Sequence, residues 1–216
     1  MADFSVIASN AGFLSEGFVL SIGLTLAGVV GGLAVGTLLS LARIFGGRFG
    51  NGLVDVYVFI FRAIPLILVI FWFYFMAPLF VGHPIGALPS AIVTFSLFEG
   101  AYYSEIIRAG IRSVRPGQMN AALACGMSRP QALRYIVLPQ AFITMIPVFF
   151  TQAIVLLQDT SLVFVVSLHD FLTSASIVAN RDGHIVEIYG FACLVYYVVC
   201  LIATTFVERL KLRVSR

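Results

Sequence analysis

Three ionisable side chains, Arg62, Glu99 and Asp159, lie inside segments that are otherwise strongly apolar. Charged residues within a bilayer are costly and are therefore functional candidates by default. A guanidinium binds carboxylates and a carboxylate accepts hydrogen bonds from cations, so these groups have the chemistry to bind a charged solute. Structural alternatives remain open. Arg62 could snorkel or pair with Asp55 or with a neighbouring span, Glu99 could make an interhelical hydrogen bond, and Asp159 could cap a broken helix.

A second candidate site is the polar stretch 113–139, which interrupts the apolar sequence. Its alanine-rich start favours a helix, and Gly126 suits the left-handed turn that ends one. Ser128 as cap and Pro130 in the first turn predict the start of a second helix. Pro139 marks entry into the next apolar segment. The pattern predicts a short helix–turn–helix at a membrane surface; the alternative is a solvated amphipathic loop on the headgroups.

The elements that must position these residues are membrane helices. The chain of 216 residues is 60% hydrophobic and 11% charged, with a mean hydropathy of +1.03, whereas soluble domains carry about 25% charged residues. The apolar runs are long and continuous, as helices of roughly 20 residues require, and lack the alternation of barrel strands. We therefore expect an all-α membrane protein, residues 1–216 forming one domain. The five predicted spans are 17–42, 53–81, 88–107, 141–168 and 185–207.

Basic residues alternate between the connections of these spans. Arginines and lysines gather in the first and third connections and in the tail 208–216, so the positive-inside rule places these segments in the cytosol. The segment 1–16 is then periplasmic. The net charge of +3 lies beside membrane segments and does not indicate nucleic-acid binding.

The first predicted span carries a stripe of small residues, Gly28, Gly32 and Gly36, spaced four apart. Such a stripe lets two helices approach closely. The close partner is either a helix of the same subunit or one of a second subunit.

The spacing N-A-A-x3-G-x9-I-x-L-P, from Asn120 to Pro139, resembles the E-A-A-x3-G-x9-I-x-L-P loop of bacterial ABC importer permeases. Other stretches resemble the polar amino-acid branch of that family, which serves histidine, glutamate, glutamine, arginine and opines. These stretches are 61–66, 103–111, 117–118 and 158–162. Within the branch, the runs 98–103, 157–162 and 180–183 are most similar to glutamate/aspartate permeases of the K type. The resemblance covers essentially the whole chain.

Three places depart from the family pattern. Asn120 replaces the family's loop glutamate, Gln158 replaces a lysine, and Ala63-Ile64 replaces Gly-Thr. The change at Asn120 weakens any claim that a carboxylate is essential for docking. It fits a permease that works as one half of a heterodimer whose partner keeps the usual loop. Gln158 supplies no positive charge at the position where the family has a lysine.

The resemblance implies a type I ABC importer transmembrane domain in the bacterial inner membrane. In such importers two permease subunits form the path, a cytosolic ATPase dimer grips their loops, and a periplasmic binding protein delivers the solute. This sequence lacks a G-x4-G-K-[ST] phosphate loop, so ATP and Mg²⁺ belong to the partner ATPase. We expect no enzyme activity, catalytic residue, metal or cofactor in this chain. The residues expected to couple to the ATPase are Gly117, Gln118, Asn120, Ala121, Ala122, Gly126, Leu138 and Pro139.

The resemblance also implies an amino-acid substrate, for which glutamate or aspartate is expected. A site for it needs an acceptor for the ammonium group and guanidinium or helix-terminal donors for carboxylates. We expect Asp159 to bind the ammonium group and Arg62 to bind a carboxylate. The residues expected to complete the site are Glu99, Gln158, Thr160 and Ser161.

Other functions remain as alternatives. The same machine could carry glutamine, histidine or arginine, or could contain two identical permeases. A secondary transporter is disfavoured because the five spans show no inverted repeat. An intramembrane enzyme is disfavoured because the spans contain no Ser/His pair and no set of metal ligands.

Overall fold

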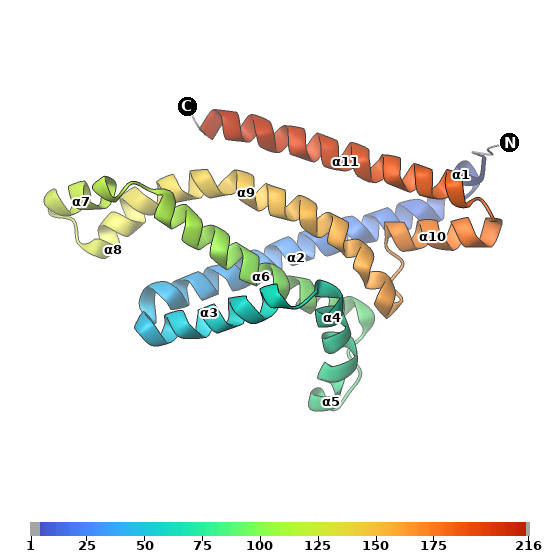
Figure 1. Ribbon diagram of the computed structural model, residues 1–216, viewed down its shortest axis with the longest axis horizontal. Coiled ribbons are helices and arrows are strands. Elements are labelled where there is room, and N and C mark those ends of the chain that lie inside the picture. The colour runs from blue at the N-terminus through green and yellow to red at the C-terminus, as the bar shows by residue number, and fades with distance from the viewer. Residues whose placement is uncertain (1–4, 215–216) are drawn as a thin grey trace.

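The computed structural model describes residues 5–214, and side chains for residues 5–212. Residues 1–4 and 215–216 of the predicted terminal segments lie outside this range. Within it the chain is helical and contains no β-strand, which confirms the predicted all-α class. Four long helices share one general direction (Figure 1): α2 (Ala11–Phe45), α6 (Ala87–Ser113), α9 (Leu138–Asp159) and α11 (Ile185–Val214).

Shorter elements connect these helices. The α-helices among them are α1 (Ser5–Ser9), α3 (Gly47–Ala63), α4 (Leu66–Phe71), α5 (Ala77–Val81), α7 (Pro116–Ala124), α8 (Arg129–Ala132) and α10 (Phe171–Asp182). Two π-helical turns, η1 (Trp72–Met76) and η2 (Leu133–Val137), and one 3₁₀-helix, η3 (Thr160–Val166), complete the order. Asp170 caps the start of α10, and its carboxylate accepts hydrogen bonds from the backbone N–H groups of Leu172 and Thr173 at 3.1 Å.

The small-residue stripe of α2 packs against α6 of the same chain, which decides between the two expected partners. A Cβ at Gly32 would lie 2.6 Å from the Cβ of Glu99, and one at Gly36 would lie 2.7 Å from the Cβ of Tyr103. Only glycine permits this approach. The contact fixes the position of Glu99 between α2 and α9.

Membrane-spanning candidates match the predicted spans with two differences. Three stretches are long and apolar enough to cross a bilayer: Ala11–Phe45, Arg129–Val166 and Ile185–Leu212. Helix α6 holds the third predicted span; its 27 residues would extend about 40 Å, yet it is not apolar enough to join them. Its buried Ser90, Thr94, Glu99 and Ser104 explain this, because α6 faces other helices rather than lipid.

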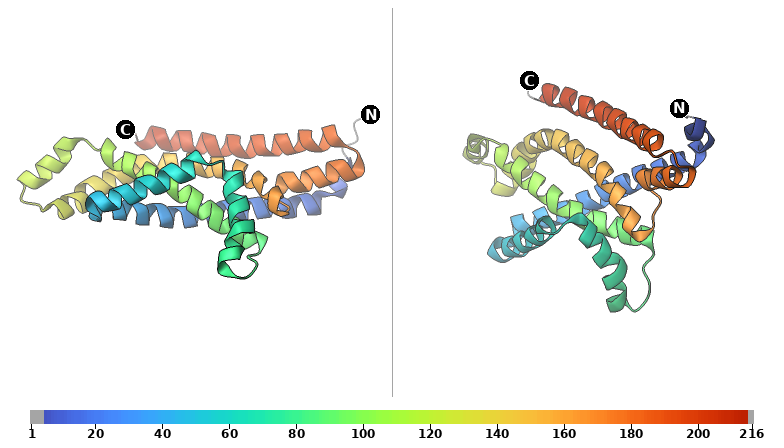
Figure 2. Two further views of the ribbon diagram at one scale, coloured as in Figure 1. Left: turned by 60° about the horizontal axis from the view of Figure 1, so that its bottom comes forward. Right: turned by 45° about the vertical axis from the view of Figure 1, so that its right-hand side comes forward.

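The second predicted span, 53–81, is not one straight helix. Helix α3 and the α4–α5 segment meet at an angle of 105°, and the pair counts as a fourth span only if taken together. Ile64 is extended, with φ −103° and ψ 133°, because the proline that follows disfavours the helical conformation. Pro65 also cannot donate to the helical ladder. Figure 2 shows α4 and α5 standing away from the long helices.

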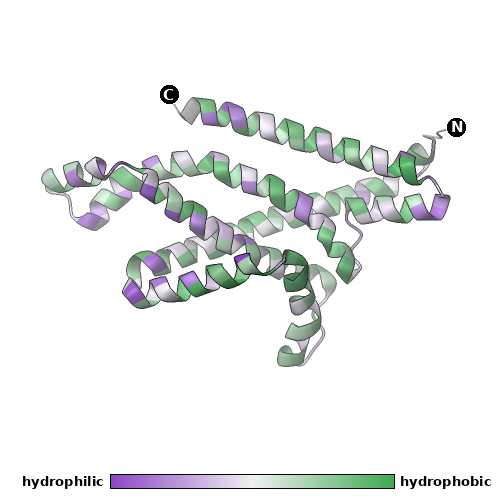
Figure 3. Cartoon of the chain, in the orientation of Figure 1, coloured by the Kyte–Doolittle hydropathy of each residue, from purple (hydrophilic) through white to green (hydrophobic). Residues whose placement is uncertain are grey.

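The surface is apolar along the long helices and polar towards both ends, including the junction of α10 and α11 (Figure 3). Exposed large hydrophobic side chains occur on α2, α3, α9 and α11, as a lipid or subunit-facing surface requires. Hydrophilic residues gather on α7 and α8 and at the neighbouring end of α3 (Figure 3). We call this the loop end of the bundle.

Candidate functional site

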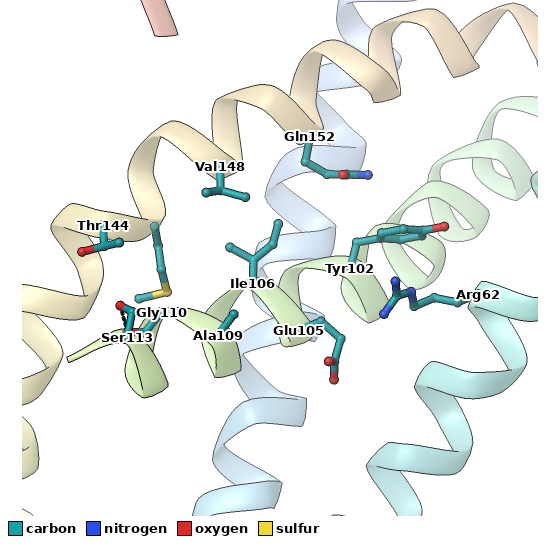
Figure 4. Close-up of a pocket in the computed structure, with 11 residues that line it drawn as sticks. Arg62, Tyr102, Glu105, Ile106, Ala109, Gly110, Ser113, Thr144, Val148 and Gln152 are labelled. Carbon is teal, nitrogen blue, oxygen red and sulfur yellow. Dashed lines mark hydrogen bonds between the residues drawn. The ribbon is translucent and has the colours of Figure 1, made fainter. Parts of the chain in front are cut away.

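An open hollow of about 470 Å³ lies between α3, α6 and α9, and we call it the α6–α9 hollow. Figure 4 shows Arg62 from α3, Tyr102 from α6 and Gln152 from α9 converging at one end of it. Ser113 and Thr144 lie at the other end. The hollow therefore offers a cation, the carboxylate of Glu105, an amide and hydroxyl groups on mostly apolar walls (Figure 4).

Arg62 occupies the last turn of α3, immediately before the break at Ile64–Pro65. Its side chain is exposed, and its guanidinium carbon lies 5.4 Å from the ring centroid of Tyr102. Asp55 pairs with Arg43 instead of Arg62, so the suggested pairing of Arg62 with Asp55 is wrong. Within residues 5–212, no carboxylate lies within ion-pair distance of Arg62. Its charge is therefore available to a ligand.

Glu99 is fully buried directly behind the same end of the hollow. Gln152 Nε2 donates to Glu99 Oε1 at 3.2 Å, while Glu99 Oε2 has no hydrogen-bond partner among the described residues. The expected interhelical hydrogen bond is thus present, but it satisfies only one oxygen. Because Gln152 lines the hollow, Glu99 is connected to the hollow through one side chain.

The remaining predicted substrate residues are not brought to this hollow. Gln158 and Ser161 line a separate hollow of about 320 Å³ against α10 and α11, which shares no lining residue with the first. Thr160 is buried and donates to Leu157 O at 2.7 Å. Asp159 is half-buried at the end of α9 and makes no capping hydrogen bond to η3. The structure thus separates Arg62 from Gln158 and Ser161.

A cluster of charges adjoins the α6–α9 hollow at the loop end of the bundle. Arg43 Nη2 lies 2.7 Å from Asp55 Oδ1, and Arg43 Nη1 lies 2.8 Å from Glu105 Oε1. Arg108 Nη2 lies 2.5 Å from Glu105 Oε2. These ion pairs join α2, α3 and α6. These ion pairs were not predicted from the sequence, and neither were the positions of Tyr102 and Gln152 in the hollow. For Gln152 the sequence did contain a signal, a polar glutamine inside an apolar segment.

The loop between α6 and α9 forms the expected helix–turn–helix. Gly126 has φ +84°, and the backbone N–H groups of Gly126 and Met127 donate to Leu123 O at 3.0 Å and to Ala122 O at 3.1 Å. This pair of bonds is the Schellman arrangement that ends a helix. Ser128 and Gln131 form a capping box at the start of α8. Both expectations for this turn are confirmed.

Several of the expected docking residues are accessible on this loop. Gly117, Gln118, Asn120, Ala121 and Gly126 are exposed, while Ala122 is buried against the rest of the loop. After the π-helical turn η2, Leu138 and Pro139 begin α9, the former half-buried and the latter exposed. The amide of Gln140 donates to Gln118 at 3.4 Å, which ties α7 to the start of α9. The loop is thus a compact projection attached to α6 and α9.

Comparisons with known proteins agree with one another. The sequence profile of the family described as "Binding-protein-dependent transport system inner membrane component" matches residues 28–216. The chain is 45% identical over 220 residues to the glutamate/aspartate import permease protein GltK of Escherichia coli O6:H1, covering 99% of this chain and 98% of that protein. It is 30% identical over 214 residues to the glutamine transport system permease protein GlnP of Escherichia coli strain K12, with 99% and 98% covered. A solved amino acid ABC transporter "with histidines" superimposes with a TM-score of 0.92 at 26% identity, covering 99% of both chains.

Proposed function

Since this chain belongs to the binding-protein-dependent transport system inner membrane components and is a permease subunit of an ABC importer, we propose that it carries glutamate and aspartate. The observation that carries this proposal is the arrangement of Arg62, Gln152 and Glu99 at one end of the α6–α9 hollow. The identity of 45% to a glutamate/aspartate import permease supports it.

An acidic amino acid has two carboxylates and one ammonium group at neutral pH, so it carries one net negative charge. Arg62 offers a guanidinium with no carboxylate partner among residues 5–212, and guanidinium–carboxylate pairs are strong and directional. The partly apolar surroundings strengthen that attraction relative to water. We therefore assign one carboxylate of the substrate to Arg62.

The ammonium group needs acceptors. Gln152 uses its amide N–H to bond Glu99, which leaves the carbonyl oxygen of Gln152 free to accept from the hollow. Behind it, Glu99 supplies a carboxyl group whose second oxygen lacks a partner in the part of the chain that is described. We assign the ammonium to this pair rather than to Asp159, which does not line the hollow.

The same charges rank the alternative substrates. Arginine or protonated histidine would bring a positive side chain towards an unpaired Arg62, which costs electrostatic energy. Glutamine avoids that repulsion but leaves the guanidinium with one carboxylate fewer to bind. A relative at 30% identity is a glutamine permease, and glutamine is therefore the second candidate.

The remaining parts of the importer are assigned by family membership and by the loop. We propose that α7 and α8 face the cytosol and dock on an ATPase dimer that supplies ATP and Mg²⁺. The N-terminal segment then faces the periplasm, where a solute-binding protein delivers the substrate. Asn120, in place of the usual loop glutamate, supports a second, non-identical permease as the partner subunit.

The experiment is equilibrium binding of labelled glutamate to the permease–ATPase complex without its solute-binding protein, so that selectivity reports the permease. Arg62→Gln should weaken binding about ten- to hundredfold, the value of one charged hydrogen bond. Arg48→Gln is the matched control, because Arg48 is an exposed arginine of the same helix that lines neither the α6–α9 hollow nor the charged cluster. Equal affinities for both variants would overturn the assignment of Arg62.

A further inference from the structure

A second hollow of about 500 Å³ opens between α3 and α6 at the charged cluster, and we call it the α3–α6 hollow. Three arginines line it, Arg43, Arg62 and Arg108, together with the carboxylates of Asp55 and Glu105. The three positive and two negative charges leave one positive charge in excess. A site of this composition attracts a single anionic group.

Two features show that the arginines of this hollow are not fully satisfied within the chain. The Arg43 side chain is 8% exposed, yet its Nε has no acceptor among residues 5–212, whereas its Nη1 is paired with Glu105 at 2.8 Å. Arg62 has no carboxylate partner in the same range. Buried donors without partners are costly, which favours an additional acceptor.

The two hollows adjoin one another. Arg62 and Glu105 line both of them, whereas Arg108 and Ala63 line only the α3–α6 hollow, and Gln152 and Ala109 line only the α6–α9 hollow. A carboxylate bound to Arg62 in the first hollow is therefore one side chain away from Arg108 and Arg43 in the second. The second hollow lies nearer the loop end, where Arg43 ends α2 and Arg108 approaches the end of α6.

We propose that the α3–α6 hollow is a second binding station for a carboxylate of the transported amino acid, with Arg62 shared between the two stations. The inference rests on the proposed function. Arg108 and Arg43 bind the carboxylate in this station, and Glu105 competes with it for both arginines. A substrate carboxylate that enters thus replaces Glu105 as the partner of these arginines. Because Glu105 remains beside them on α6, it can bind them again, and the solute can then leave.

The test measures how glutamate protects two single cysteines from an anionic, sulfonate-bearing methanethiosulfonate reagent. The three native cysteines are first replaced by serine, since Cys125 and Cys193 are exposed. Ala63→Cys then reports the α3–α6 hollow and Ala109→Cys the α6–α9 hollow, because both alanines are exposed and each lines one hollow only. The permease–ATPase complex is measured in nanodiscs of phosphatidylcholine, with and without phosphatidylglycerol.

We expect glutamate to slow modification of both variants in both lipid mixtures. Adding Arg108→Gln should raise the glutamate concentration needed at Ala63→Cys about tenfold and leave that at Ala109→Cys unchanged. Asp55→Asn should act in the opposite sense at Ala63→Cys, because it frees Arg43 from a competing carboxylate, and it serves if Arg108→Gln fails to assemble.

Three results would overturn the second station. Protection at Ala109→Cys alone would leave the proposed function standing without it. If neither Arg108→Gln nor Asp55→Asn changed the glutamate concentration needed to protect Ala63→Cys, glutamate would bind elsewhere. Dependence on phosphatidylglycerol instead of glutamate would identify the occupant as a lipid phosphate. Protection at neither position would count against the proposed function itself.

Discussion

Replacement of Gly32 by alanine tests whether the contact between α2 and α6 positions Glu99. The new Cβ would lie 2.6 Å from the Cβ of Glu99 and 2.9 Å from a ring carbon of Tyr103, and both of those residues are fully buried. Overpacking of this kind costs about 1–3 kcal/mol. Alanine gains about 1 kcal/mol over glycine within a helix. The expected net effect of Gly32→Ala is therefore a loss of about 0–2 kcal/mol.

The matched control is Gly23→Ala on the same helix, where no heavy atom lies within 4 Å of the added Cβ. This variant keeps the gain in helix propensity without the overpacking, so it should be about 1–3 kcal/mol more stable than Gly32→Ala. The assay is the midpoint of thermal unfolding of the purified complex, combined with labelled glutamate binding. Gly32→Ala should also weaken glutamate binding, because it displaces Glu99 from Gln152. Equal stability and equal binding for the two variants would refute the close packing.

Three further predictions concern the loop between α6 and α9, the charged cluster, and the cap of helix α10. Gly126→Val should lower the amount of solute imported per ATP hydrolysed, because a residue with a side chain pays about 1–2 kcal/mol to adopt the φ of +84° found at Gly126. Asn120→Ala should lower this ratio less. A larger loss for Asn120→Ala than for Gly126→Val would contradict a docking role based on the shape of the loop. Arg43→Gln should destabilise the complex by about 1–3 kcal/mol, because the Arg43 side chain is only 8% exposed. Asp55→Asn should cost under about 1 kcal/mol, because the Asp55 side chain is 64% exposed. Equal losses of stability in thermal unfolding would exclude the buried ion pair. Asp170→Ala should cost about 0.5–2 kcal/mol as a lost helix cap, and Asp170→Asn less; the opposite order would show that the carboxylate does not act as a cap.

Features that depend on local sequence were predictable. The left-handed turn at Gly126 and the cap at Ser128 follow from a few neighbouring residues, and both occur where the sequence placed them. The break at Pro65 had an equally local signal, a residue before proline, but the long apolar run around it obscured that signal.

Features that depend on packing between distant segments were not predictable. The pairing of Arg43 with both Asp55 and Glu105 requires α2, α3 and α6 to meet at one place, and no single segment encodes it. Gln158 appeared to belong with Arg62 because both lie in motifs of the family. Gln158 in the last turn of α9 and Ser161 in the 3₁₀-helix that follows instead line a hollow against α10 and α11.

The central claim is that the α6–α9 hollow binds an acidic amino acid through an otherwise unpaired Arg62. Competition against labelled glutamate, measured on the permease–ATPase complex without a solute-binding protein, tests it most directly. The account predicts that aspartate competes best, glutamine less well and arginine least, and that Arg62→Gln removes the preference of aspartate over glutamine. Competition by arginine or glutamine equal to that by aspartate in the unmodified complex would contradict the claim.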